Sequence, residues 1–183
     1  MKPMSALIAA LVLSFLVGAA PAEEEPPVTQ MPLTVFLVRH AEKLDASRDP
    51  ALSPAGTERA VTLAGVLGDA GLTHVHSSDY IRTRTTAAPV AKAMGLEVMV
   101  YDPRDLPGMA TSLRATGGVH LVVGHSNTTP ALTELLGGAP GEPIQEKGEY
   151  DRLYVVTVAA DGTTQSTLLR YGAPFVSGPT KAE

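Results

Sequence analysis

Hydrophobic and polar positions follow two alternating patterns along the chain. Continuous apolar runs rich in β-branched residues are typical of strands buried on both faces of a sheet, and they occur at 33–38 and 119–123. Shorter runs at 74–76 and 97–101 predict two further strands between them. Between the strands the apolar spacing changes to i, i+3, i+4, i+7, which predicts amphipathic helices.

Two helices are predicted in the first half of the chain. One begins at Ser53-Pro54, because serine is a good N-cap and proline suits the first helical position, and it ends at Gly71. The apolar face of this helix is formed by Ala60, Leu63, Ala64 and Leu67. The apolar face of the second helix is formed by Ala87, Val90, Ala91 and Met94.

In the last third of the chain, the apolar pattern and the turn residues predict one more helix and a hairpin. The helix begins at Thr129-Pro130 and continues through Leu136. Two strand runs, 153–158 and 165–171, flank Asp161-Gly162, a dipeptide typical of hairpin turns. Strands and helices therefore alternate before a final hairpin. This order predicts an α/β fold, a three-layer α/β/α sandwich with a mostly parallel sheet that ends in a β-hairpin.

The N-terminal segment is expected to lie outside this domain. Lys2 precedes an apolar stretch at 6–18, and Ala20-Pro21-Ala22 then matches the small-x-small pattern of a signal-peptidase site. The apolar stretch is short for a membrane span. We therefore expect a cleaved signal, export to the periplasm or the exterior, and no stable membrane insertion after cleavage; an uncleaved anchor is the alternative. The expected organisation is a signal peptide at 1–22, a linker at 23–32, the domain at 33–172 and a flexible tail at 173–183.

Composition narrows the functions open to the domain. The chain has 183 residues and is 44% hydrophobic, which is enough for one domain with its own core. The absence of cysteine excludes disulfides, thiolate metal sites and cysteine nucleophiles. A formal net charge of -5 argues against nucleic acid as a partner, although it is compatible with a small basic pocket for one phosphate.

Arginine and histidine residues follow three of the predicted strands. Arg39 and His40 come directly after the first strand, and Arg82 follows the short strand at 74–76. His125 comes directly after the strand at 119–123. Because the carboxyl ends of parallel strands meet at one edge of a sheet, we expect these side chains to converge. Arginine matches phosphate oxygens with a planar fork of donors, and a neutral histidine can act as a nucleophile.

Four segments, in order along the chain, resemble the motifs of the histidine phosphatase superfamily. They are RHAEK at 39–43, LSPAG at 52–56, SSDYIRTRTTA at 77–87 and VVGHSNTTP at 122–130. Each motif is weak alone, but four in the correct order and strand context are specific. The resemblance implies the phosphoglycerate-mutase-like fold and a phosphatase that hydrolyses a phosphate monoester, a small phosphorylated substrate. With the predicted signal peptide, we expect it to act in the cell envelope.

The resemblance also implies roles for the matching residues. His40 and His125 would be catalytic, with His40 the nucleophile that becomes phosphohistidine. Arg39, Arg82 and His125, the last as an imidazolium, would bind the phosphoryl oxygens. Since these cations supply the positive charge, and no carboxylate cluster accompanies them, we expect no metal and no cofactor.

The general acid and the exact substrate remain open. Ser126 follows His125, where acid phosphatases of the family have aspartate, so the acid is Asp102, Asp105 or no residue at all. The alternative functions are a phosphatase for phosphohistidine or for envelope sugars, and a phosphate-binding relative without activity. Because only 106–118 separates two strands, with no long insertion, we expect an open pocket.

Other polar residues are expected to be structural. His74, His76 and His120 flank or occupy strands, and we expect them to pack or to lie on the surface. Arg59 is expected to be solvated on a helix face.

Overall fold

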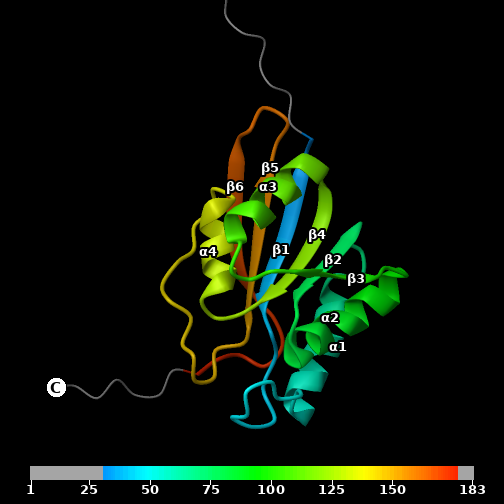
Figure 1. The fold of residues 1–183 in the computed structure, drawn as a ribbon, viewed down its shortest axis with the longest axis vertical. Helices are drawn as coiled ribbons and strands as arrows, with labels where there is room; N and C mark the ends of the chain where they lie inside the picture. The colour runs from blue at the N-terminus through cyan, green and yellow to red at the C-terminus, as the bar shows by residue number, and fades with distance from the viewer. Residues whose placement is uncertain (1–30, 177–183) are drawn as a thin grey trace, which may run out of the picture.

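The computed structural model describes residues 31–176 (Figure 1). The predicted signal peptide, most of the predicted linker and the end of the predicted tail lie outside this range. The elements, in order, are β1 Leu33–Arg39, α1 Pro54–Val66, β2 His74–Ser78, α2 Ile81–Met94, β3 Val98–Tyr101, α3 Leu106–Thr116, β4 Gly118–Gly124, α4 Thr128–Leu135, β5 Arg152–Val158 and β6 Thr164–Arg170. None of the helices in the described range is long and apolar enough to cross a membrane.

One six-stranded sheet, in the order β3-β2-β4-β1-β5-β6, organises the domain. β1 pairs with β4, and β2 pairs with both β3 and β4, all in parallel. β5 pairs antiparallel with β1 and with β6, as the predicted hairpin requires. The sheet is therefore mixed, with its parallel strands on one side and the hairpin on the other. The predicted α/β class and the terminal hairpin are confirmed.

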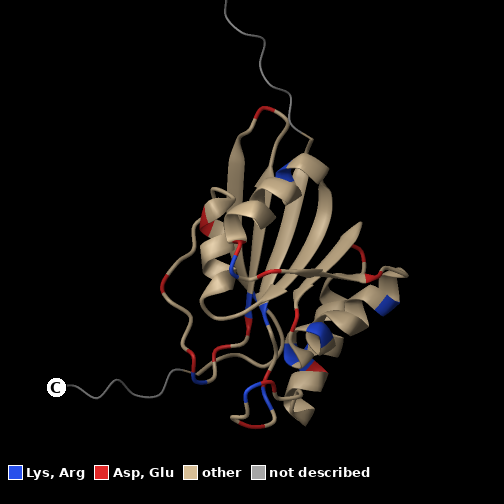
Figure 2. Cartoon of the chain, viewed as in Figure 1, with Lys and Arg blue, Asp and Glu red and all other residues tan. Residues whose placement is uncertain are grey.

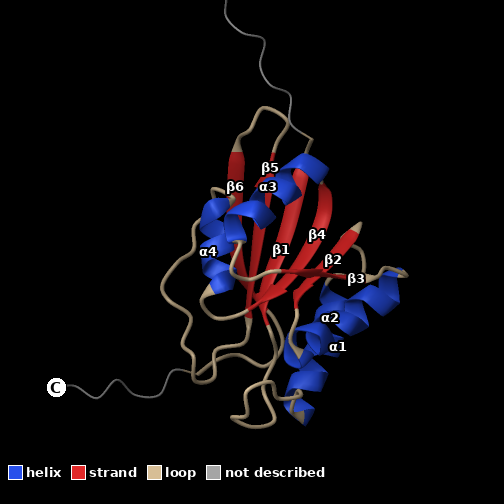
Figure 3. Cartoon of the chain, viewed as in Figure 1, coloured by secondary structure: helices blue, strands red, loops and turns tan. Residues whose placement is uncertain are grey.

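Helices cover both faces of this sheet, which gives the predicted three layers (Figure 3). On one face α3 and α4 bury Leu113, Leu132 and Leu136 against sheet residues such as Val35 and Val156. On the other face the packed helices are α1 and α2, and the buried cluster includes Leu63, Leu67, Ala87, Val90, Val75, Leu121 and Val123. Burial of this apolar surface from water is the main force that holds the layers together.

Two helices differ from their sequence predictions. α1 begins as predicted, with the Ser53 side chain accepting a hydrogen bond from the Gly56 backbone N–H at 3.1 Å. It ends at Val66 rather than at Gly71, because the chain turns at 67–69 before reaching the glycine. α3 forms within 106–118, which the pattern left as a connection. Asp105 caps this helix by accepting from the Gly108 backbone N–H.

Candidate active site

The carboxyl ends of β1, β2 and β4 meet at one edge of the sheet, as predicted. Because these strands run in parallel, Arg39 at the end of β1 is paired with Gly124 at the end of β4. The His40 backbone N–H then donates to the Gly124 carbonyl at 2.9 Å, which fixes the start of the loop after β1. Charged residues are concentrated in the loops and turns around this end of the sheet, whereas the strands themselves are mostly uncharged (Figure 2).

The RHAEK and LSPAG motifs form one packed unit. The Ser53 backbone N–H donates to the Glu42 carbonyl at 2.9 Å. A Cβ atom at Gly56 would lie 2.3 Å from the same carbonyl oxygen, so only glycine lets α1 approach the loop this closely. Ala41 is fully buried with ordinary backbone angles, and its N–H donates to Thr86 Oγ1 at 3.0 Å. The two motifs therefore hold the chain that follows β1 in one position.

Arg59 is buried, and the expectation that it is solvated is wrong. Its side chain is about 5% exposed and pairs with the Glu42 carboxylate at 2.8 Å. It also donates to the carbonyls of Tyr171 and Ala173, near the C-terminal end of the domain. The residue occupies the buried side of α1, with Ala60 and Leu63. Arg59 thus joins the loop after β1 to the segment after β6.

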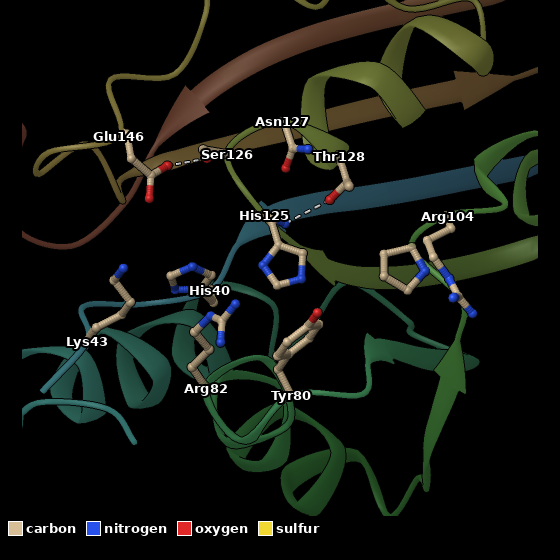
Figure 4. Close-up of a pocket in the computed structure, with 11 residues that line it drawn as sticks. His40, Lys43, Tyr80, Arg82, Arg104, His125, Ser126, Asn127, Thr128 and Glu146 are labelled. Carbon is tan, nitrogen blue, oxygen red and sulfur yellow. Dashed lines mark hydrogen bonds between the residues drawn. The ribbon is translucent and has the colours of Figure 1, made fainter. Parts of the chain in front are cut away.

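A cavity of about 380 Å³ lies at this edge of the sheet. Its walls are formed by His40, Lys43, Tyr80, Arg82, Pro103, Arg104, His125, Ser126, Asn127, Thr128 and Glu146. Figure 4 shows His40, Arg82 and His125 close together, with Lys43 and Glu146 on one side of them and Tyr80 and Arg104 on the other. Three of the four predicted site residues therefore share one cavity. Arg39 does not line it.

His40 is held as a neutral imidazole with one free nitrogen. Its Nδ1 lies 2.8 Å from the Ala41 carbonyl oxygen. A carbonyl can only accept, so Nδ1 carries the proton and Nε2 keeps its lone pair. Burial lowers the pKa of His40 to about 3, and the neighbouring charges of Arg39, Arg82 and His125 act in the same direction. At neutral pH the ring is therefore neutral, and its Nε2 lone pair is free.

His125 is oriented by a chain of hydroxyl groups. Thr83 donates to the Ser78 carbonyl at 2.7 Å, and the Ser78 hydroxyl donates to Thr83 Oγ1. Ser78 Oγ is therefore left to accept from His125 Nε2, 2.9 Å away. Burial, followed by the charges of Arg82 and Arg39, lowers the pKa of His125 to about 4. In the free protein the ring is thus neutral at pH 7, and an imidazolium requires a bound anion.

Arg82 and Arg39 each have a buried donor without a partner. Only three buried side-chain nitrogen or oxygen atoms among the described residues lack a hydrogen bond, and two of them are Nε of Arg39 and Nε of Arg82. Arg82 Cζ lies 4.3 Å from the Tyr80 ring centroid, and its Nη1 lies 3.3 Å from Asp49 Oδ1. Unsatisfied buried guanidinium donors are costly, and an oxyanion would satisfy them.

Arg39 is mainly an anchor for the loop that precedes β5. Its Nη1 and Nη2 atoms donate to the carbonyls of Gln145, Glu146 and Glu149. Nη2 also lies 2.9 Å from the Glu146 carboxylate, and the guanidinium stacks on the Tyr150 ring at 4.2 Å. The side chain is 1% exposed. Apart from Nε, its donors are therefore already used by the protein.

The two predicted candidates for the general acid lie away from the cavity. Asp102 pairs with Arg104 at 2.8 Å, and hydrogen bonds from Arg104 lower the pKa of Asp102 to about 2. Asp105 is occupied as the N-cap of α3. Glu146 lines the cavity instead, and it comes from a loop whose sequence has no periodicity that would single it out. Only the three-dimensional arrangement identifies it.

The remaining histidines form a separate group, as expected for structural residues. His74, His76 and His120 stack on one another, with ring centroids 4.5 to 6.1 Å apart, and none of them lines the cavity. Within the described part of the chain, no three His, Cys, Asp or Glu side chains are arranged to hold a metal ion.

Known proteins resemble this chain in sequence and in fold. Residues 35–104 match the family model of the histidine phosphatase superfamily (branch 1). The sequence is 44% identical to the "Probable phosphoglycerate mutase GpmB" of Erwinia tasmaniensis over a 79-residue alignment, which covers 39% of this chain and 36% of that protein. The chain thus spans about a third of the length of this relative. The family-model match includes the RHAEK, LSPAG and SSDYIRTRTTA motifs within 35–104.

Two solved structures extend the likeness in fold to most of the domain. The protein histidine phosphatase SixA complexed with tungstate superposes with a TM-score of 0.58 at 21% identity, covering 76% of this chain and 96% of that one. The mycobacterial glucosyl-3-phosphoglycerate phosphatase superposes with a TM-score of 0.58 at 16% identity, covering 79% and 100%. The chain is thus similar in sequence to the histidine phosphatase superfamily over residues 35–104, and its domain has the phosphoglycerate-mutase-like fold.

Proposed function

We propose that this protein is a metal-independent phosphatase that hydrolyses phosphate monoesters through a phosphohistidine at His40. The supporting observation is the state of His40, a buried neutral ring whose Nδ1–H is held by the Ala41 carbonyl. Its Nε2 lone pair is therefore available in a cavity lined by cationic groups. A nucleophile beside donors for oxyanions is the arrangement that phosphoryl transfer requires.

In the first half of the reaction, His40 Nε2 attacks phosphorus and the bond from phosphorus to the leaving oxygen breaks. Arg82, on the cavity wall, binds the equatorial oxygens, whose charge increases in the transition state, and Arg39 behind the wall adds positive charge to the site. The dianionic substrate favours protonation of His125, which then donates to the same oxygens while its Nε2–H stays on Ser78. Water attacks the phosphohistidine in the second half and releases phosphate.

The substrate is held mainly by its phosphate. The cavity is open to solvent, and Lys43 and Arg104 on its walls suit substrates with a second negative charge. Phosphohistidine is the second candidate substrate, because an imidazole leaves without strong acid assistance. Phosphorylated envelope sugars are further candidates for the screen.

The proposed location is the cell envelope or the exterior. It rests on the sequence of residues 1–22, whose basic start, apolar stretch and small-x-small site predict a cleaved signal peptide. Export argues against a glycolytic mutase, because phosphoglycerates are cytoplasmic. A mature protein that begins at Glu23 in the envelope fraction of a producing bacterium would support export, and an intact Met1 would contradict it.

The test is turnover of 4-nitrophenyl phosphate by the purified protein, with and without EDTA. Wild-type activity that EDTA leaves unchanged is the expected result, and His40→Ala is expected to abolish it. His74→Ala is the matched control, because this histidine lies outside the cavity. A folded His40→Ala protein with substantial activity would refute the nucleophile, and loss of activity in EDTA would refute the metal-independent mechanism. Phosphate binding without any turnover would indicate a non-catalytic relative.

A further inference from the structure

Glu146 is the carboxylate of the cavity, and the mechanism above does not use it. It lies in the loop between α4 and β5, and its side chain is 61% exposed. One carboxylate oxygen lies 2.9 Å from Arg39 Nη2, and the other accepts a hydrogen bond from the Ser126 hydroxyl. Ser126 follows His125 directly, so this bond ties the carboxylate to the loop after β4 (Figure 4).

No other carboxylate among the described residues lines the cavity. Asp102 pairs with Arg104, and Asp105 caps the N-terminus of α3. Asp49 pairs with Arg82 but does not line the cavity. Cleavage of an ester of an ordinary alcohol needs a proton on the leaving oxygen, because an alkoxide is a poor leaving group. Of the two histidines that line the cavity, His40 is assigned to phosphorus and His125 to the phosphoryl oxygens in the proposed mechanism, so Glu146 is the cavity carboxyl group left for the leaving oxygen.

We infer that Glu146 is the general acid and base of the reaction, an assignment that rests on the proposed function. Its protonated carboxyl gives a proton to the leaving oxygen as the P–O bond breaks and the bond from phosphorus to His40 forms. Its carboxylate then takes a proton from the attacking water as a new P–O bond forms and the P–N bond breaks. The carboxyl is thus restored in each cycle, and the products are one alcohol and one phosphate.

The contacts of Glu146 can respond to a bound substrate. In the free protein its carboxylate contacts Arg39 and the Ser126 hydroxyl. A bound phosphate ester brings negative charge beside the carboxylate and competes with it for the guanidinium donors. The high exposure of the side chain allows exchange of the proton with water.

The experiment compares Glu146→Gln with wild type on two substrates, 4-nitrophenyl phosphate and glycerol phosphate. Nitrophenolate leaves without a proton, so its release gains little from an acid. We expect Glu146→Gln to lower kcat on glycerol phosphate by ~10²-fold or more, the usual contribution of general acid catalysis, and to change kcat on nitrophenyl phosphate only a few-fold. Glu142→Gln is the matched control, because this exposed glutamate of the same loop does not line the cavity.

Equal losses on both substrates would overturn the inference, because they would mean that Glu146 only positions Arg39 or the loop. Retention of glycerol phosphate activity by Glu146→Gln would overturn it as well. A wild-type protein that hydrolyses neither substrate would instead overturn the proposed function, and the acid role with it. Asp102→Asn is expected to have the same small effect on both substrates, and a selective loss of glycerol phosphate activity in this variant would transfer the role to Asp102.

Discussion

Replacing Arg59 with alanine is expected to destabilise the protein by about 3 kcal/mol, near the lower limit for removal of one partner of a buried ion pair. Arg59 makes three hydrogen bonds to the Glu42 carboxylate, at 2.8, 2.9 and 3.0 Å. Two more reach the carbonyls of Tyr171 and Ala173, at 2.7 and 2.9 Å. The substitution leaves all of these acceptors without their donor.

The lower limit applies because the Glu42 side chain is 24% exposed and regains part of its hydration in the variant. For a domain of this size, each kcal/mol changes the melting temperature by about 2–4 °C, so the expected decrease is about 6–12 °C. Arg59→Lys is expected to recover only part of the loss, because an ammonium group cannot form the bidentate bonds to the carboxylate.

The assay is thermal and urea unfolding followed by circular dichroism. Arg84→Ala is the control, since Arg84 pairs with Asp79 at the surface of α2 and exposed pairs contribute less than about 1 kcal/mol. The double variant with Glu42→Gln is expected to be less destabilised than the sum of the single variants, because the two residues interact directly. Equal stabilities for Arg59→Ala and Arg84→Ala would refute the reasoning.

Three further predictions concern the oxyanion site. Arg82→Ala is expected to lower kcat/KM by ~10²-fold with little effect on unfolding, because the guanidinium faces the cavity; unchanged kinetics would contradict its role. Arg39→Ala is expected to lower both activity and stability, because it removes the side-chain hydrogen bonds that hold residues 145–149. An unchanged free energy of unfolding would contradict this structural role. Sulfate binding at pH 6 is expected to be coupled to uptake of a proton by His125, and to weaken as the pH rises. The pKa of His125 is about 4 in the free protein, and the bound anion raises it by favouring the imidazolium. Calorimetry in buffers of different ionisation enthalpy measures this uptake, and its absence would exclude the imidazolium.

The sequence predicts the features of the fold that local chemistry determines. The β-branched run of β1 and the Ser53 cap of α1 depend on neighbouring residues, and both form where expected. His40, Arg82 and His125 reach one cavity because each follows a parallel strand, a rule that needs only the order of the elements. The positions of these three residues can therefore be predicted from strand order and residue type.

Features that depend on tertiary contacts cannot be predicted from local sequence patterns. α3 begins with Leu106-Pro107-Gly108, a start with low intrinsic helix propensity, and it forms because Met109 and Leu113 pack on the sheet. Arg59 has the polarity of a surface residue, and only its distant partners make its burial favourable. Glu146 belongs to a segment without periodicity that Arg39 and Arg152 hold through backbone carbonyls. No local pattern encodes those bonds.

The antiparallel direction of β5 brings a long connection back to the candidate site. Because β5 runs opposite to β1, its first residues lie beside the end of β1, with Leu153 opposite Val38. The loop that enters β5 therefore reaches the cavity at Glu146, whereas His40 and Arg82 belong to the parallel half of the sheet. Residues 137–144 precede the segment that contacts Arg39, so changes in their length or sequence are expected to alter access to the cavity without moving His40 or Arg82. In protein engineering, these residues are the first choice for changing substrate preference.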